Sequence, residues 1–201
     1  MKIVFTLLLS FVFLSSCAQD KITEVGATDF QKEMNAEYKD ASTSPLKDKD
    51  RAVFEGLDFF AFDSAYVVKA KFSKLDNEQP FEMKTTTERL PVYVKYGKVS
   101  FELKGQRFEL NVYQNQDLMK KEGYEDYLFL PFLDHTNGNE SYGGGRYIDM
   151  RIPKGDTVEI DFNKAYNPYC AYNEKYSCPL VPTENYLDTE VRAGVKVFKK
   201  H

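Results

Sequence analysis

The chain has 201 residues, of which 42% are hydrophobic and 29% charged, and its formal net charge is −4 at neutral pH. This length suits one domain with a substantial core and is short for two. An acidic chain has no cationic excess to neutralise phosphates, so the composition disfavours a general nucleic-acid binder. The aromatic content of 15%, with no Trp, favours β-strands.

The N-terminus has the layout of an export signal. Lys2 precedes an apolar run over residues 3–14, which is too short for a transmembrane helix of about 20 residues. The run ends in Leu-Ser-Ser-Cys at residues 14–17, which resembles a bacterial lipobox. We therefore expect residues 1–16 to be a lipoprotein signal peptide and Cys17 to carry a diacylglycerol. The alternative is an ordinary cleaved secretion signal with an incidental cysteine.

Lipidation would make the bilayer the first partner of the protein, through the acylated Cys17. Residues 17–27 would then be the lipidated cysteine and a short polar tether. Ala18, rather than Asp, follows the cysteine. By resemblance to other lipoproteins, this predicts anchoring in the cell envelope at the outer membrane, facing the periplasm.

Two helices are predicted at the start of the domain. Thr28 and Gln31 form a capping-box pattern, and apolar residues at helical spacing predict a helix over residues 29–41. Pro45 is suited to the first turn of a second, short helix. The side chains expected on the buried face of this second helix are those of Val53, Phe54 and Leu57.

From about residue 64 the hydrophobic period changes to two, which predicts strands. The alternating segments are residues 68–72, 92–94, 99–103, 108–112, 148–152 and 158–162. Glycines at 97, 105 and 155 mark short turns, and connections this short predict antiparallel neighbours. We therefore expect an α+β, mainly β fold: one curved antiparallel sheet or partial barrel with the N-terminal helices packed on it. Residues 28–201 are expected to form this single domain.

Two stretches show no period. Residues 114–145 have an apolar centre at 127–133, and residues 164–185 are rich in Asn, Tyr and Pro and contain two Cys. An irregular stretch of about 20 residues in a compact domain is commonly functional or cross-linked.

The order of several motifs carries a family resemblance. These are Ser44-Pro45-Leu46, Phe54-Glu55-Gly56-Leu57, Ser141-Tyr142-Gly143-Gly144-Gly145-Arg146-Tyr147, Asp161-Phe162-Asn163, Ala165-Tyr166-Asn167-Pro168, Cys170-Ala171-Tyr172, Ser177-Cys178-Pro179, Asn185 and Val191-Arg192-Ala193-Gly194. Over residues 44–198 the chain resembles DUF1684, a family of bacterial and archaeal proteins of unknown function. The resemblance implies no reaction. Many relatives have Gly-Glu where this chain has Gly194-Val195, which removes a carboxylate.

The candidate ligand site combines residues at strand ends with residues of the irregular segment 164–185. Arg binds carboxylate or phosphate in a bidentate manner, and Tyr offers an apolar face with a polar tip. The alternative is a structural network in which Asn side chains satisfy backbone groups. The residues expected to share one hollow are Arg146, Asp161, Asn163, Tyr166, Asn167, Tyr172 and Asn185.

Cys170 and Cys178 could form a disulfide, a pair of buried thiols, or a metal or catalytic site. Beyond these, only His135 and His201 are available as soft ligands, so no metal site is predicted. His135, beside Asp134, is interpreted as a turn residue rather than a general base. The three glycines at 143–145 precede an alternating strand rather than a helix, which argues against a nucleotide cofactor, and no cofactor is predicted.

Three functions are open at this stage. The favoured one is an envelope-anchored lipoprotein that binds a small molecule. The second is a carboxylate-dependent enzyme, with Asp149 or Asp161 as base and Arg146 holding a small anionic substrate. The third is an envelope accessory domain that presents its sheet to another protein, which predicts an exposed apolar patch and no pocket. The sequence leaves the oligomeric state undefined.

Overall fold

The computed structural model describes residues 28–199. The predicted signal peptide, the lipidated Cys17 and its tether lie outside the described residues, as do the last two residues of the predicted domain. None of the helices within residues 28–199 has the length and apolarity that crossing a bilayer requires.

Helix α1 spans Asp29–Lys39 and begins with the predicted capping box. The Thr28 hydroxyl accepts a hydrogen bond from the backbone N–H of Gln31, and the Gln31 side chain accepts one from the backbone N–H of Thr28. Met34 and Tyr38 lie on the buried face, as the helical spacing predicts. The opposite face is rich in charged residues.

The second helix is shorter than expected. Helix α2 spans Asp48–Ala52, so Pro45 precedes it by three residues instead of opening it. Phe54 and Leu57 are buried, but Val53 is 55% exposed. The chain leaves the helix at Val53, and the side chains that follow no longer keep a helical spacing.

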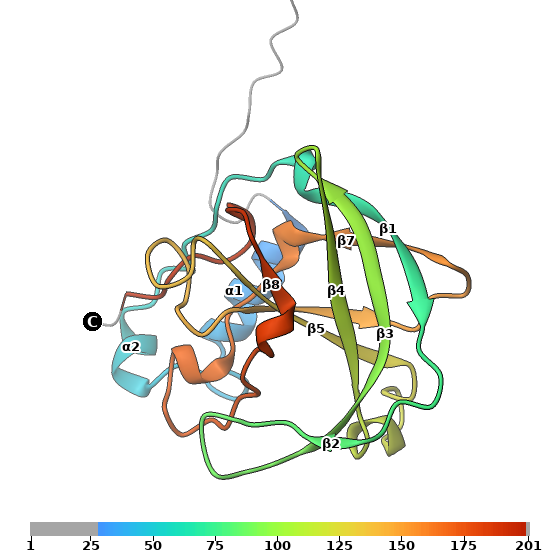
Figure 1. Ribbon diagram of the computed structural model, residues 1–201. Helices are drawn as coiled ribbons and strands as arrows, with labels where there is room; N and C mark the ends of the chain where they lie inside the picture. The colour runs from blue at the N-terminus through green and yellow to red at the C-terminus, as the bar shows by residue number, and fades with distance from the viewer. Residues whose placement is uncertain (1–27, 200–201) are drawn as a thin grey trace, which may run out of the picture.

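Eight strands within the described residues form one curled, half-barrel sheet (Figure 1), so the predicted mainly β fold with a curved antiparallel sheet is confirmed. The strand order is β6-β5-β4-β3-β1-β7, with β2 paired to β3 and β8 paired in parallel to β5. The strands are β1 (Val67–Lys74), β2 (Phe81–Glu82), β3 (Val92–Leu103), β4 (Gln106–Asn115), β5 (Tyr127–Asp134), β6 (Arg146–Arg151), β7 (Thr157–Asp161) and β8 (Tyr186–Leu187).

Two of the three predicted turns are different in the structure. Gly105 lies in the tight turn between β3 and β4, with positive φ. Gly97 instead lies inside β3, where the register shifts between Lys95 and Gly97, so the two predicted strands are one bulged strand. A Cβ at Gly97 would lie 2.8 Å from the Phe72 ring, which explains the missing side chain.

The link around Gly155 joins strands that are not neighbours. Strand β7 pairs with β1, whereas β6 pairs with β5, so the two strands lie at opposite ends of the sheet order. The prediction that they pair with each other was wrong because the sheet curls enough to bring its two ends within reach of a short link.

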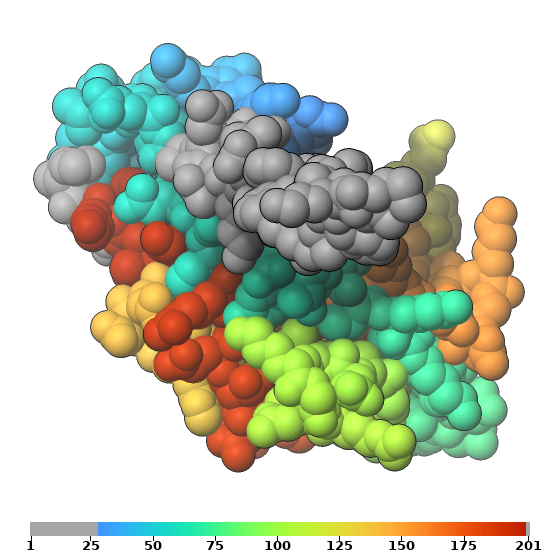
Figure 2. All heavy atoms as spheres, turned by 90° about the horizontal axis from the view of Figure 1, so that it is seen from above, coloured from blue at the N-terminus to red at the C-terminus, as the bar shows by residue number. Residues whose placement is uncertain are grey.

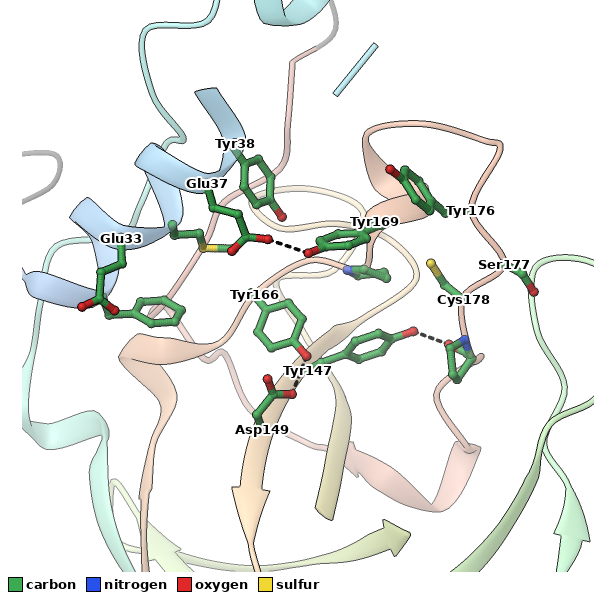
Figure 3. Close-up of a pocket in the computed structure, with 14 residues that line it drawn as sticks. Glu33, Glu37, Tyr38, Tyr147, Asp149, Tyr166, Tyr169, Tyr176, Ser177 and Cys178 are labelled. Atoms are coloured by element: carbon green, nitrogen blue, oxygen red, sulfur yellow. Dashed lines mark hydrogen bonds between the residues drawn. The ribbon is translucent and has the colours of Figure 1, made fainter. Parts of the chain in front are cut away.

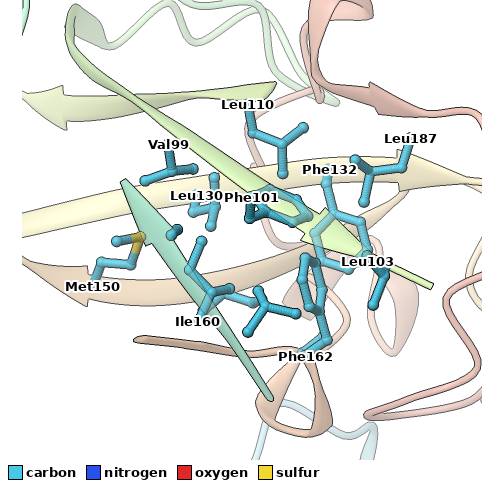
Figure 4. Packing of buried hydrophobic residues seen from close by; sticks show 14 of the residues in the cluster. Val99, Phe101, Leu103, Leu110, Leu130, Phe132, Met150, Ile160, Phe162 and Leu187 are labelled. Atoms are coloured by element: carbon cyan, nitrogen blue, oxygen red, sulfur yellow. The ribbon is translucent and has the colours of Figure 1, made fainter. Parts of the chain in front are cut away.

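The core fills the inside of the curled sheet (Figure 4). Alternate residues of β1 and β3, such as Ala70, Val99 and Phe101, pack there against Leu130 and Phe132 of β5. Strand β5 was not predicted, because nearly all of its residues are buried or half-buried and its sequence does not alternate.

The irregular segment 164–185 is built from short turns of 3₁₀ helix: η3 (Phe162–Lys164) at its start, η4 (Tyr169–Ala171) and η5 (Thr183–Asn185). Two others, η1 (Ser64–Tyr66) and η2 (Leu118–Lys120), lie outside it. Figure 2 shows the C-terminal stretch (red) running between the chain that follows α1 (cyan) and the β3–β4 hairpin (yellow-green). A β-bridge between Phe59 and Val195 fixes part of this path.

Candidate functional site

Arg146 begins β6 and its side chain is completely buried. Its Nη2 donates to Asp134 Oδ2 at 2.8 Å and to the Val191 carbonyl at 2.7 Å, and its Nη1 donates to the Ala193 carbonyl. Arg146 therefore ties the C-terminal stretch to β5, and its guanidinium has no access to a solute.

Asp161 and Asn163 form a second tie at the end of β7. Asp161 Oδ1 accepts from the Asn163 backbone at 3.0 Å and from its side chain at 2.9 Å. Asn163 in turn exchanges two hydrogen bonds with the backbone of Asp63, at 3.0 and 3.1 Å. These side chains connect β7 to the chain that enters η1.

The two remaining Asn residues serve backbone groups. Asn185 donates to the carbonyls of Asn111 and Pro131 at 2.8 and 2.7 Å, so it joins β4 to β5 where they diverge. Asn167 donates to the Lys196 carbonyl at 2.8 Å and to the hydroxyl of the buried Tyr172 at 3.3 Å. Both amides match the structural alternative considered for irregular segments.

The structure thus does not gather the seven candidate residues in one hollow. Asp161 and Tyr166 line one depression beside Asp149, whereas Arg146, Asn167 and Asn185 are fully buried. The Arg146 side chain hydrogen-bonds to the C-terminal stretch at 191–193, and among the described residues it makes no hydrogen bond to the segment 164–185. Of the seven, Tyr166 lines a well-formed pocket within residues 28–199, together with Asp149, the alternative base. That pocket is the candidate functional site.

The pocket lies between α1, β6 and the irregular segment, and its volume is about 470 Å³ (Figure 3). This is within the usual range of about 300–1,000 Å³ for small-molecule sites. Six of the 14 residues that line it are aromatic. The tyrosines that line it are Tyr38, Tyr147, Tyr166, Tyr169 and Tyr176.

A backbone pairing places Tyr166 beside β6. The N–H and C=O groups of Tyr147 and Tyr166 bond each other reciprocally at 2.9 and 3.0 Å, so the irregular segment briefly continues the sheet beyond the β6 edge. The two rings meet edge to face with centroids 5.9 Å apart. Tyr147 also donates its hydroxyl to the Pro179 carbonyl on the opposite wall.

Asp149 lies at the floor of the pocket on β6. Its Oδ1 accepts hydrogen bonds from the hydroxyls of Tyr166 at 2.5 Å and Tyr127 at 2.7 Å. Within the described chain Oδ2 has no hydrogen-bond partner, and Asp149 is exposed. The carboxylate is thus held in one orientation with an oxygen free to accept a donor from a ligand.

Burial, followed by the nearby Tyr127 and Asp149, raises the pKa of Tyr166 well above the ordinary value of 10.0. Burial raises the pKa of Tyr127 as well, again with Asp149 as a contributor. Both phenols therefore stay protonated at neutral pH, where they serve as hydrogen-bond donors and cannot act as bases.

The rim of the pocket is acidic. Glu33 and Glu37 are one turn apart on α1, and both line the pocket. The Tyr169 hydroxyl donates to Glu37 Oε1 at 2.7 Å, and this bond joins the helix to the irregular segment. Among the described residues that line the pocket none is basic, so the lining itself carries a net negative charge.

Comparison with known proteins agrees with the motif order. Residues 52–196 match the model of the family described as "Protein of unknown function (DUF1684)". The chain belongs to the DUF1684 family. A solution NMR structure of an uncharacterised protein from Haloarcula marismortui is 33% identical, covering 83% of this chain and 89% of that chain, with a TM-score of 0.65. No curated protein matches the chain.

In this DUF1684 domain, Val195 is 1% exposed and packs in the apolar cluster beneath α1. Its backbone N–H donates to the Ala165 carbonyl at 2.9 Å. The position at which the family resemblance implied a missing carboxylate is therefore a core position here, outside the pocket.

The other motifs also have defined places. His135 Nε2 lies 2.9 Å from Asp188 Oδ1 at the surface, in the turn that follows β5. Gly145 has a φ of +87°, and a Cβ there would lie 2.7 Å from the Phe132 carbonyl. The last of the three glycines is thus required by the close approach of the chain to β5.

Cys170 and Cys178 are both thiols in the structure. The Cys170 backbone N–H donates to Cys178 Sγ at 3.1 Å, and Cys178 lines the pocket. Within the described residues no group of three or more His, Cys, Asp or Glu is arranged to hold a metal ion.

Sequence reasoning missed the α1 contribution to the pocket. Glu33 and Glu37 are four residues apart, on either side of the buried Met34 in the sequence. From the sequence alone, this pattern predicts only that the two carboxylates lie on the solvent-exposed face of the helix. Tyr169 and Tyr176 were noticed only as part of an irregular segment. The missing information is the docking of this segment against α1, which no local period encodes.

Proposed function

We propose that the DUF1684 domain of this protein binds a small organic cation, an amine or quaternary ammonium group with an apolar body, in the pocket between α1 and β6. The observation that carries the proposal is the charge of the lining: three carboxylates, from Glu33, Glu37 and Asp149, and no basic side chain among the described lining residues.

The tyrosine walls support the same ligand class. A cation over an aromatic face gains about 0.5–1 kcal/mol at exposed sites and about 2 kcal/mol or more when desolvated. The ring of Tyr176 already makes such a contact within the chain, where Lys175 Nζ lies 5.0 Å from its centroid. The free Oδ2 of Asp149 would accept a hydrogen bond from an ammonium group or pair with its charge.

The alternatives receive less support. An enzyme that holds an anionic substrate with Arg146 would need that guanidinium in the pocket, but it is buried and paired with Asp134. A pocket lined by three carboxylates would also repel an anion. An accessory domain was expected to have no pocket, whereas described residues enclose one of about 470 Å³ between α1, β6 and the irregular segment.

Ligand-observed NMR on the full chain tests the proposal with three probes of similar shape: benzyltrimethylammonium, benzyl alcohol and benzoate. We expect the cation to bind and the two others to bind at least tenfold more weakly. Binding of benzoate as tight as that of the cation would contradict the proposal.

The Asp149→Asn variant keeps the shape of the pocket and removes one charge. The probe has no N–H, so the variant removes only the pairing of its charge with the exposed Asp149 carboxylate, which contributes up to about 1 kcal/mol, and the affinity for benzyltrimethylammonium should fall about fivefold. Glu122→Gln makes the same charge change at an exposed site outside the pocket and is expected to leave the affinity unchanged. Equal affinities of the two variants would argue against a role for Asp149.

We further propose that the domain performs this binding at the cell envelope, as a lipoprotein anchored through Cys17 in the outer membrane and facing the periplasm. The apolar run followed by Leu-Ser-Ser-Cys supports the anchor. The ten tether residues, 18–27, span at most about 35 Å when fully extended. The anchor would therefore keep α1, one wall of the pocket, close to the bilayer.

Metabolic labelling with an alkyne analogue of palmitate in a bacterial host checks the anchor. We expect the full chain to incorporate the label and to fractionate with membranes, and the Cys17→Ser variant to do neither. An unlabelled, freely secreted wild-type chain would show that the N-terminus is an ordinary secretion signal.

A further inference from the structure

Two thiols meet where the irregular segment forms the pocket wall. Cys170 lies in η4, and Cys178 follows the turn that contributes Tyr176 and Ser177 to the lining. The 3.1 Å hydrogen bond from the Cys170 N–H to Cys178 Sγ closes this turn on itself. The segment between the two cysteines is thus already a loop whose ends touch.

The Cys178 end of the loop is fixed from outside. The Cys178 N–H donates to Thr86 Oγ1 at 3.1 Å, and the Thr86 N–H donates to the Cys178 carbonyl at 2.9 Å. The Cys170 end lies in η4, whose Ala171 N–H donates to the Pro168 carbonyl at 2.9 Å. Both sulfur atoms are therefore presented by held backbone, and closing a bond between them requires little ordering of the chain.

The environments of the two thiols differ in the way that thiol–disulfide exchange requires. Cys170 is half-buried, so a small molecule can reach it, whereas Cys178 is only 6% exposed. The Tyr142 hydroxyl lies 3.8 Å from Cys170 Sγ.

Hydrogen bonding from the Cys178 thiol, helped by Tyr142, lowers the pKa of Cys170. The same hydrogen bond and burial raise the pKa of Cys178. Cys170 is therefore the thiol that ionises first, and the thiolate is the nucleophile in exchange.

We propose that Cys170 and Cys178 form a redox-active pair that reacts with low-molecular-weight disulfides, with Cys170 as the attacking thiol and Cys178 as the resolving thiol. The Cys170 thiolate attacks one sulfur of the disulfide RS–SR, so an S–S bond forms at Cys170 and RS⁻ leaves. Cys178 then loses its proton and attacks the Cys170 sulfur, which releases the second RS⁻. The protein gives up two electrons and two protons, and RS–SR is reduced to two RSH.

The Cys170–Cys178 disulfide that results links the two ends of the loop that carries Tyr176 and Ser177. The redox state of the cysteine pair therefore acts directly on the pocket wall. This inference does not depend on which ligand the pocket takes, since the exchange is measured without one. Redox activity of the pair is therefore expected even if no cation binds. Cation binding, in turn, can be measured whether or not the two thiols react.

The test uses the full chain with Cys17→Ser, so that Cys170 and Cys178 are its only thiols. The folded protein is incubated with oxidised glutathione, quenched with acid, denatured, treated with N-ethylmaleimide in denaturant so that the buried Cys178 is also labelled, and weighed by mass spectrometry. We expect both maleimide adducts to be lost and the mass to fall by two hydrogens, with no glutathione retained. Two maleimide adducts on the folded chain, under conditions that oxidise the denatured chain, would overturn the proposal.

Single-thiol variants assign the two roles. With Cys178→Ser, the mixed disulfide has no resolving thiol, so glutathione should accumulate on Cys170. With Cys170→Ser, the remaining Cys178 should react at least tenfold more slowly, because it is buried. A faster reaction at Cys178 than at Cys170 would reverse the assigned roles and contradict the mechanism.

Discussion

Arg146 is the largest side chain that is fully buried within residues 28–199. Its partner Asp134 accepts at Oδ1 from the backbone N–H groups of Thr136 and Val191, at 2.9 and 3.1 Å, and at Oδ2 from Arg146. The carboxylate is thus surrounded by donors that compensate its burial. A family motif that looks like a ligand-binding arginine is here part of the framework that holds the C-terminal stretch.

Replacing Arg146 with Met tests this framework role. The change leaves Asp134 buried without its charge partner, which typically costs about 3–5 kcal/mol, so we expect a large fall in the free energy of unfolding in urea. Arg151→Met removes an exposed arginine that pairs with Asp126 at the surface, and it should leave stability nearly unchanged. Equally small changes in the free energy of unfolding for the two variants would contradict the framework role and favour a ligand-binding role for Arg146.

The elements differ in how well local sequence predicts them. Helix α1 carries its own start signal and one apolar face, so its beginning was predicted correctly. Strand β5 and the separation of β6 from β7 were missed, because two-sided burial removes the alternation and because curling of a sheet is not local information. Asp149 and Tyr166 were each considered as candidates, but the backbone pairing of Tyr147 with Tyr166, which places Tyr166 beside Asp149, involves no repeated pattern.

The entry into β6 depends on Gly145, which packs against β5. Gly145→Ala would place a Cβ 2.7 Å from the Phe132 carbonyl at a φ of +87°. Left-handed strain and overpacking together should lower the stability by about 2 kcal/mol or more. At Gly143 a Cβ would meet only the Gly138 backbone, at 3.5 and 3.8 Å, which is ordinary van der Waals contact, so Gly143→Ala is the matched control. Thermal unfolding of both variants decides the point, and equal melting temperatures would contradict the proposed packing role.

At the scale of the whole molecule, buried tyrosines join helix α1 to the sheet and to the irregular segment. Tyr38 on α1, Tyr147 on β6 and Tyr172 in the irregular segment are all buried, and the rings of Tyr38 and Tyr172 meet edge to face with centroids 4.9 Å apart. Burial is the largest cause that raises the pKa of each of these three phenols. The interface between the sheet and the helices is thus built from groups that must stay neutral.

This arrangement predicts alkaline unfolding. A phenol whose pKa is raised by folding stabilises the folded state fully below its ordinary value of 10.0, and that contribution is lost as the pH rises above 10 toward the folded-state pKa. Phenolate absorbance of the 14 tyrosines should therefore rise in two steps: exposed rings such as Tyr124 first, then the buried rings together with loss of circular dichroism. In urea all should titrate in one step, which provides the control. A single step near pH 10 with the fold intact would show that these rings are not buried in solution.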